Sequence, residues 1–250
     1  MRRAVLLEFR KMRRLRTLPI VLVMVVAVAA LSSASLFAGS TQTTFEDPAA
    51  HPWAGLLLSY TLMAAMTSPI LAAVLASRQT DIEHAGTGWT LASIAGFTPG
   101  TLCRAKLAAL SGILLAAVLI QTLLVVGAGM LAGIRVPLDA GPWIGYTLLL
   151  FLVDVALVAL HIWLAATVEN QLISVGVGML GAFLAVFTLL APGAAFWIAP
   201  WGAYALISHV AQTAGEVGYV TPPYPWIIGL LALVGITFTL ATRRFNRLER

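Results

Sequence analysis

Residues 107–133 read LAALSGILLAAVLIQTLLVVGAGMLAG and contain no charged side chain. An α-helix needs about 20 mainly apolar residues to cross the hydrocarbon core of a bilayer, so this stretch is long enough to span it. Further apolar intervals predict spans at 17–38, 54–77, 142–167, 171–191 and 224–242. Backbone groups in lipid must be paired within their own segment, and the pattern does not alternate with a period of two. The predicted fold class is therefore an all-α, polytopic membrane protein with six transmembrane helices.

The composition agrees with exposure to lipid. Of the 250 residues, 60% are hydrophobic and 10% are charged, whereas a soluble domain carries roughly 25% charged residues. A net charge of +5 is compatible with nucleic-acid binding. The basic residues lie almost entirely outside the apolar runs, however, so we interpret them as orienting the protein and predict no nucleic-acid partner. A single cysteine, Cys103, excludes an intrachain disulfide, and no metal site is predicted.

Lysine and arginine placement predicts the orientation. If both termini are cytosolic, 14 of the 15 basic residues lie inside and only Arg135 lies outside. Cytoplasmic segments of membrane proteins carry this excess of positive charge. We therefore predict a multi-pass protein with cytosolic N- and C-termini.

Residues 193–215 are predicted to form an outer re-entrant or interfacial helical excursion after the fifth span. Pro192 and Pro200 interrupt this apolar interval, and Trp197 and Trp201 suit a membrane interface. The interval is also long enough for two crossings, which would place the termini on opposite sides. Charge placement favours the excursion.

The first 16 residues are predicted to form a basic amphipathic helix at the inner membrane interface. Four residues recur at helical spacing, namely Val5, Phe9, Met12 and Arg16, and the other arginines from Arg10 onward are turned elsewhere. The interfacial basic residues are Arg10, Lys11, Arg13 and Arg14. Two roles stay open for this helix, which are anchoring by anionic lipid and contact with a protein partner.

The segment 78–105, between the second and third spans, is long for a connection between transmembrane helices. We predict that residues 81–84 extend the second span beyond the membrane as a helix, and that Gly86 helps to end it. Residues 89–97 would then run along the membrane surface, and Pro99 would turn the chain into the third span. Such a segment suits a cytosolic partner, and a plain solvated loop is the alternative.

Several residues of this segment follow one another in a recognisable order, which is Glu83, Gly86-Thr87, Trp89, Pro99 and Lys106. With this order the segment resembles the coupling region of type-2 ABC exporter permeases, especially those of bacitracin and lantibiotic self-immunity. Thr90 departs from the pattern, because that group often has lysine there. The start from Glu8 to Arg14 also resembles the group's Glu-x-x-Lys-x-basic opening, so the resemblance covers the whole chain.

The resemblance implies that residues 1–250 form a single permease domain in a bacterial cytoplasmic membrane. A second permease copy, identical or not, would complete the substrate path, and each copy would dock a separate cytosolic ATPase. The implied ATPase-coupling residues are Asp81, Glu83, His84 and Trp89, with Glu83 lying in a cleft of the ATPase. A peptide antibiotic, a drug or a lipid-like molecule would be exported, which would give antibiotic resistance or immunity.

ATP and magnesium are expected on the partner subunit, and no cofactor is expected in this chain. The sequence agrees, because it contains no G-x-x-x-x-G-K-[ST] phosphate loop. Neither of its lysines follows a glycine.

Asp154 lies near the middle of the fourth predicted span, where an aspartate costs about 2.5 to 3.5 kcal/mol on insertion scales. We expect a hydrogen bond to Gln121, in the adjacent span, to reduce this cost. His161 lies two turns further along the same face. Two interpretations stay open for these intramembrane polar residues, which are an interhelical clamp and a substrate or proton role.

Two other classes of function remain as alternatives. The first is a proton-coupled secondary transporter with Asp154 as the proton site. The second, an intramembrane enzyme, has less support because neither H-E-x-x-H nor G-x-S-x-G occurs. No catalytic residue is predicted. Small residues at Gly129-x-x-x-Gly133 and Ser174-x-x-x-Gly178 fit either a dimer face or internal packing.

Overall fold

The computed structural model describes residues 1–191, 199–213 and 215–248. Six of its helices are long and apolar enough to cross a membrane, which confirms the predicted number of spans. Their bounds are α2 Thr17–Ser33, α4 Pro52–His84, α6 Pro99–Ala132, α7 Ala140–Thr167, α8 Gln171–Leu190 and α10 Tyr224–Leu248. A 3-10 helix, η1 (Ala34–Phe37), continues α2.

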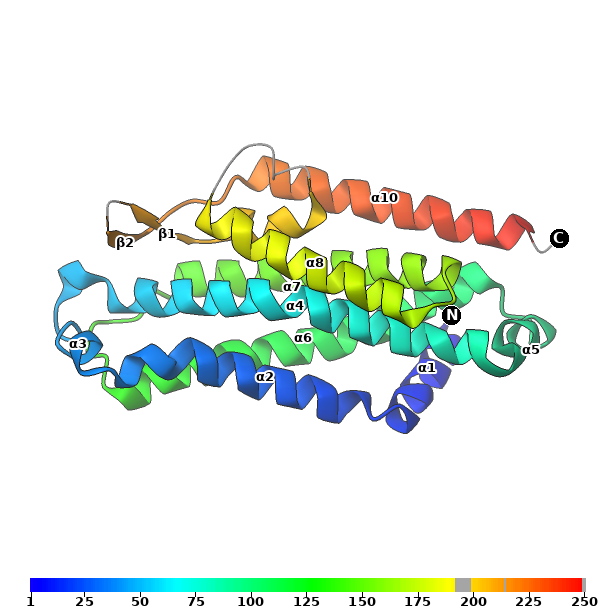
Figure 1. The fold of residues 1–250 in the computed structure, drawn as a ribbon, viewed down its shortest axis with the longest axis horizontal. Coiled ribbons are helices and arrows are strands. Elements are labelled where there is room, and N and C mark those ends of the chain that lie inside the picture. The colour runs from blue at the N-terminus through cyan, green and yellow to red at the C-terminus, as the bar shows by residue number, and fades with distance from the viewer. Residues whose placement is uncertain (192–198, 214, 249–250) are drawn as a thin grey trace.

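Most of the shorter elements lie near the two ends of an elongated bundle, whereas η5 and α9 pack beside α8 along its length (Figure 1). The shorter elements are α1 Arg2–Arg14, α3 Gly39–Gln42, η2 Pro48–Ala50, η3 Ala85–Thr87, α5 Gly88–Ile94, η5 Pro200–Gly202, α9 Ala203–Leu206, β1 Val210–Thr213 and β2 Glu216–Tyr219. Helices α1 and α5 lie with the C-terminal part of α10 at one end, called the α5 end below. Helix α3 and strands β1 and β2 lie at the opposite end, called the hairpin end.

Helix α6 begins at residue 99, eight positions before the predicted start of the third span. Thr98 caps it by accepting a hydrogen bond from the backbone N–H of Thr101 (3.3 Å), and Pro99 is its first residue. Both features favour a helix start. Helix α4 runs to His84, as predicted for residues 81–84. With 33 and 34 residues, α4 and α6 exceed the length that a crossing needs.

Helix α4 lies at the centre of the bundle and packs against α2, α7 and α8. Much of its buried face is made of small residues, which are Ala64, Ala65, Ala72, Ala73 and Ala76. Neighbouring helices therefore approach closely. A Cβ added to Gly178 of α8 would lie 2.4 Å from the Cβ of Ala73, and one added to Gly129 would lie 2.6 Å from the Trp53 ring. These two glycines serve internal packing.

The predicted helical excursion at 193–215 is only partly helical. Residues 192–198, which include Pro192 and Trp197, lie outside the described residues, and so does residue 214. The short helices η5 and α9 follow, but the prediction is wrong from Val210 onward, where β1 pairs with β2 as an antiparallel hairpin. Gly215 has a φ of +91°, as a tight hairpin connection requires.

Candidate functional site

Four charged side chains from three helices meet at the α5 end. Glu8 and Lys11 come from α1, Glu83 from the end of α4, and Lys106 from the second turn of α6. Lys106 Nζ lies 3.0 Å from Glu8 Oε2 and 2.7 Å from Glu83 Oε1. Lys11 Nζ pairs with Glu8 Oε1 at 2.8 Å and also with Glu83 Oε1. Two carboxylates thus balance two ammonium groups, and this set is called the charge cluster below.

Three side chains of the charge cluster are buried, whereas that of Lys11 is 28% exposed, and the hydrogen bonds of the cluster are nearly complete. The side chains of Glu8 and Lys106 are both 0% exposed. Lys106 Nζ donates its third hydrogen bond to the backbone oxygen of Gln79 (2.8 Å), so all three donors of the ammonium are used. Gln79 Nε2 donates to Glu8 Oε2 (2.6 Å). Removal of one member would leave an uncompensated charge, which costs about 3 to 5 kcal/mol in a buried pair.

Helical spacing brings these residues together. Glu8 and Lys11 are three positions apart on α1, and Gln79 and Glu83 are four apart on α4, so each pair shares one face of its helix. Burial lowers the pKa of Lys11, but its hydrogen bonds to Glu8 and Glu83 outweigh this and raise the pKa above the ordinary lysine value. Lys11 therefore stays charged at neutral pH.

The four predicted ATPase-coupling residues occupy different environments. Asp81 is exposed, whereas Glu83 is only 3% exposed and belongs to the charge cluster. Its carboxylate is enclosed by α1 and α6, where it pairs with Lys11 and Lys106.

His84 and Trp89 form a second contact, which joins α5 to the bundle. His84 Nε2 lies 2.8 Å from the backbone oxygen of Ala165 in α7, and Trp89 Nε1 donates to His84 Nδ1 (3.4 Å). The backbone oxygen of Ala165 can only accept, so Nε2 donates in the first bond and Nδ1 accepts in the second. Beyond them, α5 presents Leu91 and Ile94, which are 61% and 79% exposed.

Helix α1 is amphipathic, and one stripe of it packs against the bundle. Arg10, Arg13 and Arg14 are exposed as predicted, whereas Lys11 turns into the charge cluster. The buried stripe consists of Ala4, Glu8 and Met12. Phe9 is 42% exposed, as an apolar side chain that meets the membrane interface would be. Glu8 takes the inward position because Lys106 supplies a buried partner, which the spacing of apolar residues alone does not reveal.

Comparison with known proteins identifies the family to which the chain belongs. A sequence profile described as "ABC-2 family transporter protein" matches residues 4–185. The chain belongs to the ABC-2 family. The match includes every member of the charge cluster and Asp154, and no curated protein matches the chain. This ABC-2 protein is accordingly a membrane-embedded permease of an ABC transporter, and it works with an ATP-binding subunit.

The intramembrane polar residues of this ABC-2 permease do not form the expected pair. The predicted Asp154–Gln121 hydrogen bond is wrong. Asp154 Oδ1 accepts from the hydroxyl of Tyr204 in α9 (2.6 Å), and Oδ2 accepts from Ser68 Oγ in α4 (3.5 Å). Gln121 Nε2 donates instead to the hydroxyl of Tyr60 (3.3 Å).

His161 contacts neither Asp154 nor Gln121. Its Nδ1 lies 3.2 Å from Ser174 Oγ, which joins α7 to α8. The three predicted residues thus make four hydrogen bonds to four different partners, and none of these bonds joins two of the three.

Aromatic side chains and His209 attach the excursion after the fifth span to α7 and α8. Besides the Tyr204–Asp154 bond, Trp201 lies over Gly181, where an added Cβ would be 2.0 Å from its Nε1. His209 lies over Gly145, where an added Cβ would be 2.4 Å from its Nε2. The glycines leave room for these rings, so the excursion is held at three points.

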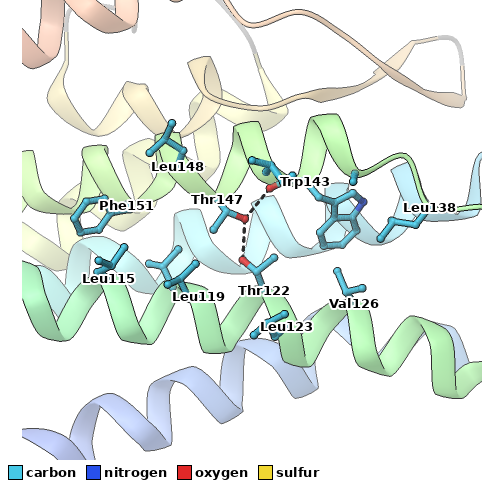
Figure 2. A pocket seen from close by; sticks show the side chains of 13 residues that line it. Leu115, Leu119, Thr122, Leu123, Val126, Leu138, Trp143, Thr147, Leu148 and Phe151 are labelled. Atoms are coloured by element: carbon cyan, nitrogen blue, oxygen red, sulfur yellow. Dashed lines mark hydrogen bonds between the residues drawn. The ribbon is translucent and has the colours of Figure 1, made fainter.

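An apolar groove of about 470 Å³ runs between α6 and α7 (Figure 2). Among the described residues that line it, none is charged. The hydroxyls of Thr122 and Thr147 lie 3.0 Å apart, and Thr147 donates to the backbone oxygen of Trp143 (2.7 Å). These polar groups satisfy one another, so the groove suits apolar groups rather than ions.

Proposed function

We propose that this chain is the permease subunit of an ATP-driven exporter, with cytosolic termini in a bacterial cytoplasmic membrane. A second permease copy would complete the transport path, and each copy would dock a separate ATPase that binds ATP and magnesium. The exported substrate would be a peptide, a drug or a lipid-like molecule, in keeping with the apolar groove between α6 and α7.

The observation that supports this proposal best is the position of the charge cluster next to α5. Helix α5 and the short η3 connect α4 to α6, and the cluster joins these two helices to α1. A force applied to α5 would therefore move α1, α4 and α6 together, because separating them exposes unpaired buried charge. In this mechanism the ATPase contacts α5, and Glu83 passes the motion on through Lys106 without touching the ATPase.

Site-specific photo-crosslinking tests this docking. A photoreactive amino acid at Leu91 or Ile94, both exposed on α5, should capture an ATP-hydrolysing chain that carries a phosphate-loop motif. The matched control is Leu131, which is 90% exposed near the hairpin end of α6. Capture of the ATPase from Leu131 but not from α5 would contradict the proposal.

The proton-coupled alternative is less well supported. A carboxylate that carries protons needs access to water, whereas Asp154 is 3% exposed and accepts bonds from Tyr204 and Ser68. These contacts favour the clamp, with the outer excursion as the element that is held.

A further inference from the structure

A second pocket lies on the opposite side of α1 from the charge cluster. It has a volume of about 350 Å³ and is formed between α1 and the segment that follows α5. The residues that line it are Arg3, Leu6, Leu7, Arg10, Ala95 and Phe97. It therefore combines two guanidinium groups with an apolar wall from two separate parts of the chain.

Arg3 and Arg10 supply the charge of this pocket. They are seven positions apart, which places them on the same face of α1 two turns from each other. Both are exposed, and within the described residues neither is paired with a carboxylate. Lys11, in contrast, is bonded to two carboxylates on the buried side. Guanidinium groups bind phosphate oxygens in a bidentate manner, so the two arginines suit a phosphate.

Leu6, Leu7 and Phe97 supply the apolar wall. Leu6 is 63% exposed and Leu7 is 41% exposed, which is unfavourable in water and favourable against hydrocarbon. Only residues 15 and 16 separate α1 from the first span, α2, so α1 lies where the membrane begins. A ligand in this pocket thus contacts the positively charged arginines and an apolar surface at the level where the membrane begins.

We propose that this pocket binds one anionic phospholipid, with its phosphate on Arg3 and Arg10 and an acyl chain against Leu6, Leu7 and Phe97. The site is discrete, because only two of the basic residues of α1 line it. Arg13 and Arg14 belong to the same helix and are exposed, but they lie outside the pocket. A diffuse attraction between α1 and an anionic surface would use all five arginines of the helix, including the exposed Arg2.

The test compares two double variants of the full-length permease, Arg3→Gln with Arg10→Gln and Arg13→Gln with Arg14→Gln. Each removes the same charge from exposed positions of α1. Phosphatidylglycerol would be titrated into phosphatidylcholine nanodiscs that hold each protein, and bound lipid would be counted by native mass spectrometry. We expect about thirtyfold weaker phosphatidylglycerol binding in the first variant and less than about a threefold change in the second.

Further arms make the outcome decisive. Arg3→Lys with Arg10→Lys keeps the charge but loses the bidentate geometry, so its binding should lie between that of the natural protein and that of the glutamine variant. Inorganic phosphate alone should not compete, because it lacks the acyl chain. Equal losses in the two glutamine variants would overturn the proposal in favour of diffuse attraction. If the Arg3/Arg10 glutamine variant kept phosphatidylglycerol but lost the ATPase subunit, the pocket would be a protein contact and the proposal would be wrong.

Discussion

Lys106 shows at the scale of a single residue why the α5 end holds together. A lysine is rarely buried unless it is paired, and here each of its three donors meets an acceptor, on Glu8, Glu83 and the Gln79 backbone. The intact cluster adds little net stability, but removal of one charge destabilises the protein strongly, because it leaves another buried charge without a partner. Charge balance can therefore be separated from coupling by choosing which members are removed.

Glu83→Gln should strongly destabilise the permease, because Lys11 and Lys106 would then share a single carboxylate. We expect a loss of about 3 to 5 kcal/mol, measured as unfolding in detergent. Glu83→Gln combined with Lys106→Met leaves Glu8 and Lys11 as a balanced pair, so most of the stability should return. The control is Glu46→Gln, which breaks the exposed Arg135–Glu46 pair and should change stability by less than about 1 kcal/mol. Similar losses in Glu46→Gln and Glu83→Gln would contradict the importance of burial.

The same double variant tests coupling. In vesicles with the ATPase subunit, Glu83→Gln with Lys106→Met should insert normally but show reduced substrate-stimulated ATP turnover, because α4 and α6 are no longer joined by charge. Normal turnover in this stable variant would mean that the cluster has only a structural role.

Asp154 offers a second test at the residue scale. Asp154→Asn keeps an oxygen that accepts from the Tyr204 hydroxyl, so transport should be largely retained. Asp154→Leu removes the acceptor and leaves a buried hydroxyl unpaired, which costs about 1 to 3 kcal/mol. In vesicles, the transport rate of Asp154→Asn should therefore be well above that of Asp154→Leu. A proton-coupled mechanism predicts instead that Asn is inactive.

At the scale of elements, the outer excursion depends on small residues of the helices beneath it. Gly181→Ala would push a methyl group into Trp201, so residues 200–209 should exchange amide hydrogens faster. Gly176→Ala is the matched control on the same helix, since no atom lies within 4 Å of its added Cβ. Hydrogen exchange followed by mass spectrometry distinguishes the two variants. Equal exchange in both would show that Trp201 does not hold the excursion.

The elements themselves were predictable to different degrees. The spans follow from where charge is absent, and the extension of α4 to His84 follows from its local residues. The start of α6 was misplaced, although Thr98 and Pro99 form a local start signal. The hairpin also had a local signal, because Gly215 lies between two short runs that contain valine.

The missed contacts of the site have a different cause, which is distance along the chain. Tyr204 is 50 positions from Asp154, and Lys106 is 98 positions from Glu8. The helical period reports which face a residue occupies, but it does not report what a distant segment places opposite that face. The sequence pattern therefore places Glu8 in the N-terminal motif and Lys11 at the membrane interface, without indicating that either side chain meets Lys106.

At the scale of the whole molecule, the α5 end and the hairpin end differ in what they present. Helices α1 and α5 lie at one end with most of the basic residues, and the hairpin with Glu216 lies at the other (Figure 1). Positive charge is retained on the cytosolic side of a membrane. The α5 end is thus expected to face the cytosol.

Cysteine labelling in intact cells tests this orientation. Glu216→Cys on the hairpin should react with a membrane-impermeant maleimide, whereas Arg244→Cys near the end of α10 should react only after lysis. Both positions are exposed, and the natural Cys103 is buried and gives little background. Labelling of Arg244→Cys in intact cells would reverse the assigned sides.

The charge cluster also constrains the order in which the protein is made. Glu8 leaves the ribosome early, but its buried partner Lys106 is synthesised 98 positions later. Helix α1 therefore cannot complete the charge cluster while the first two spans are inserted. During this time it remains undocked at the membrane surface. Its exposed arginines and leucines can bind the nascent helix to lipid until the third span is inserted. A ribosome stalled before codon 106 would thus carry an undocked α1.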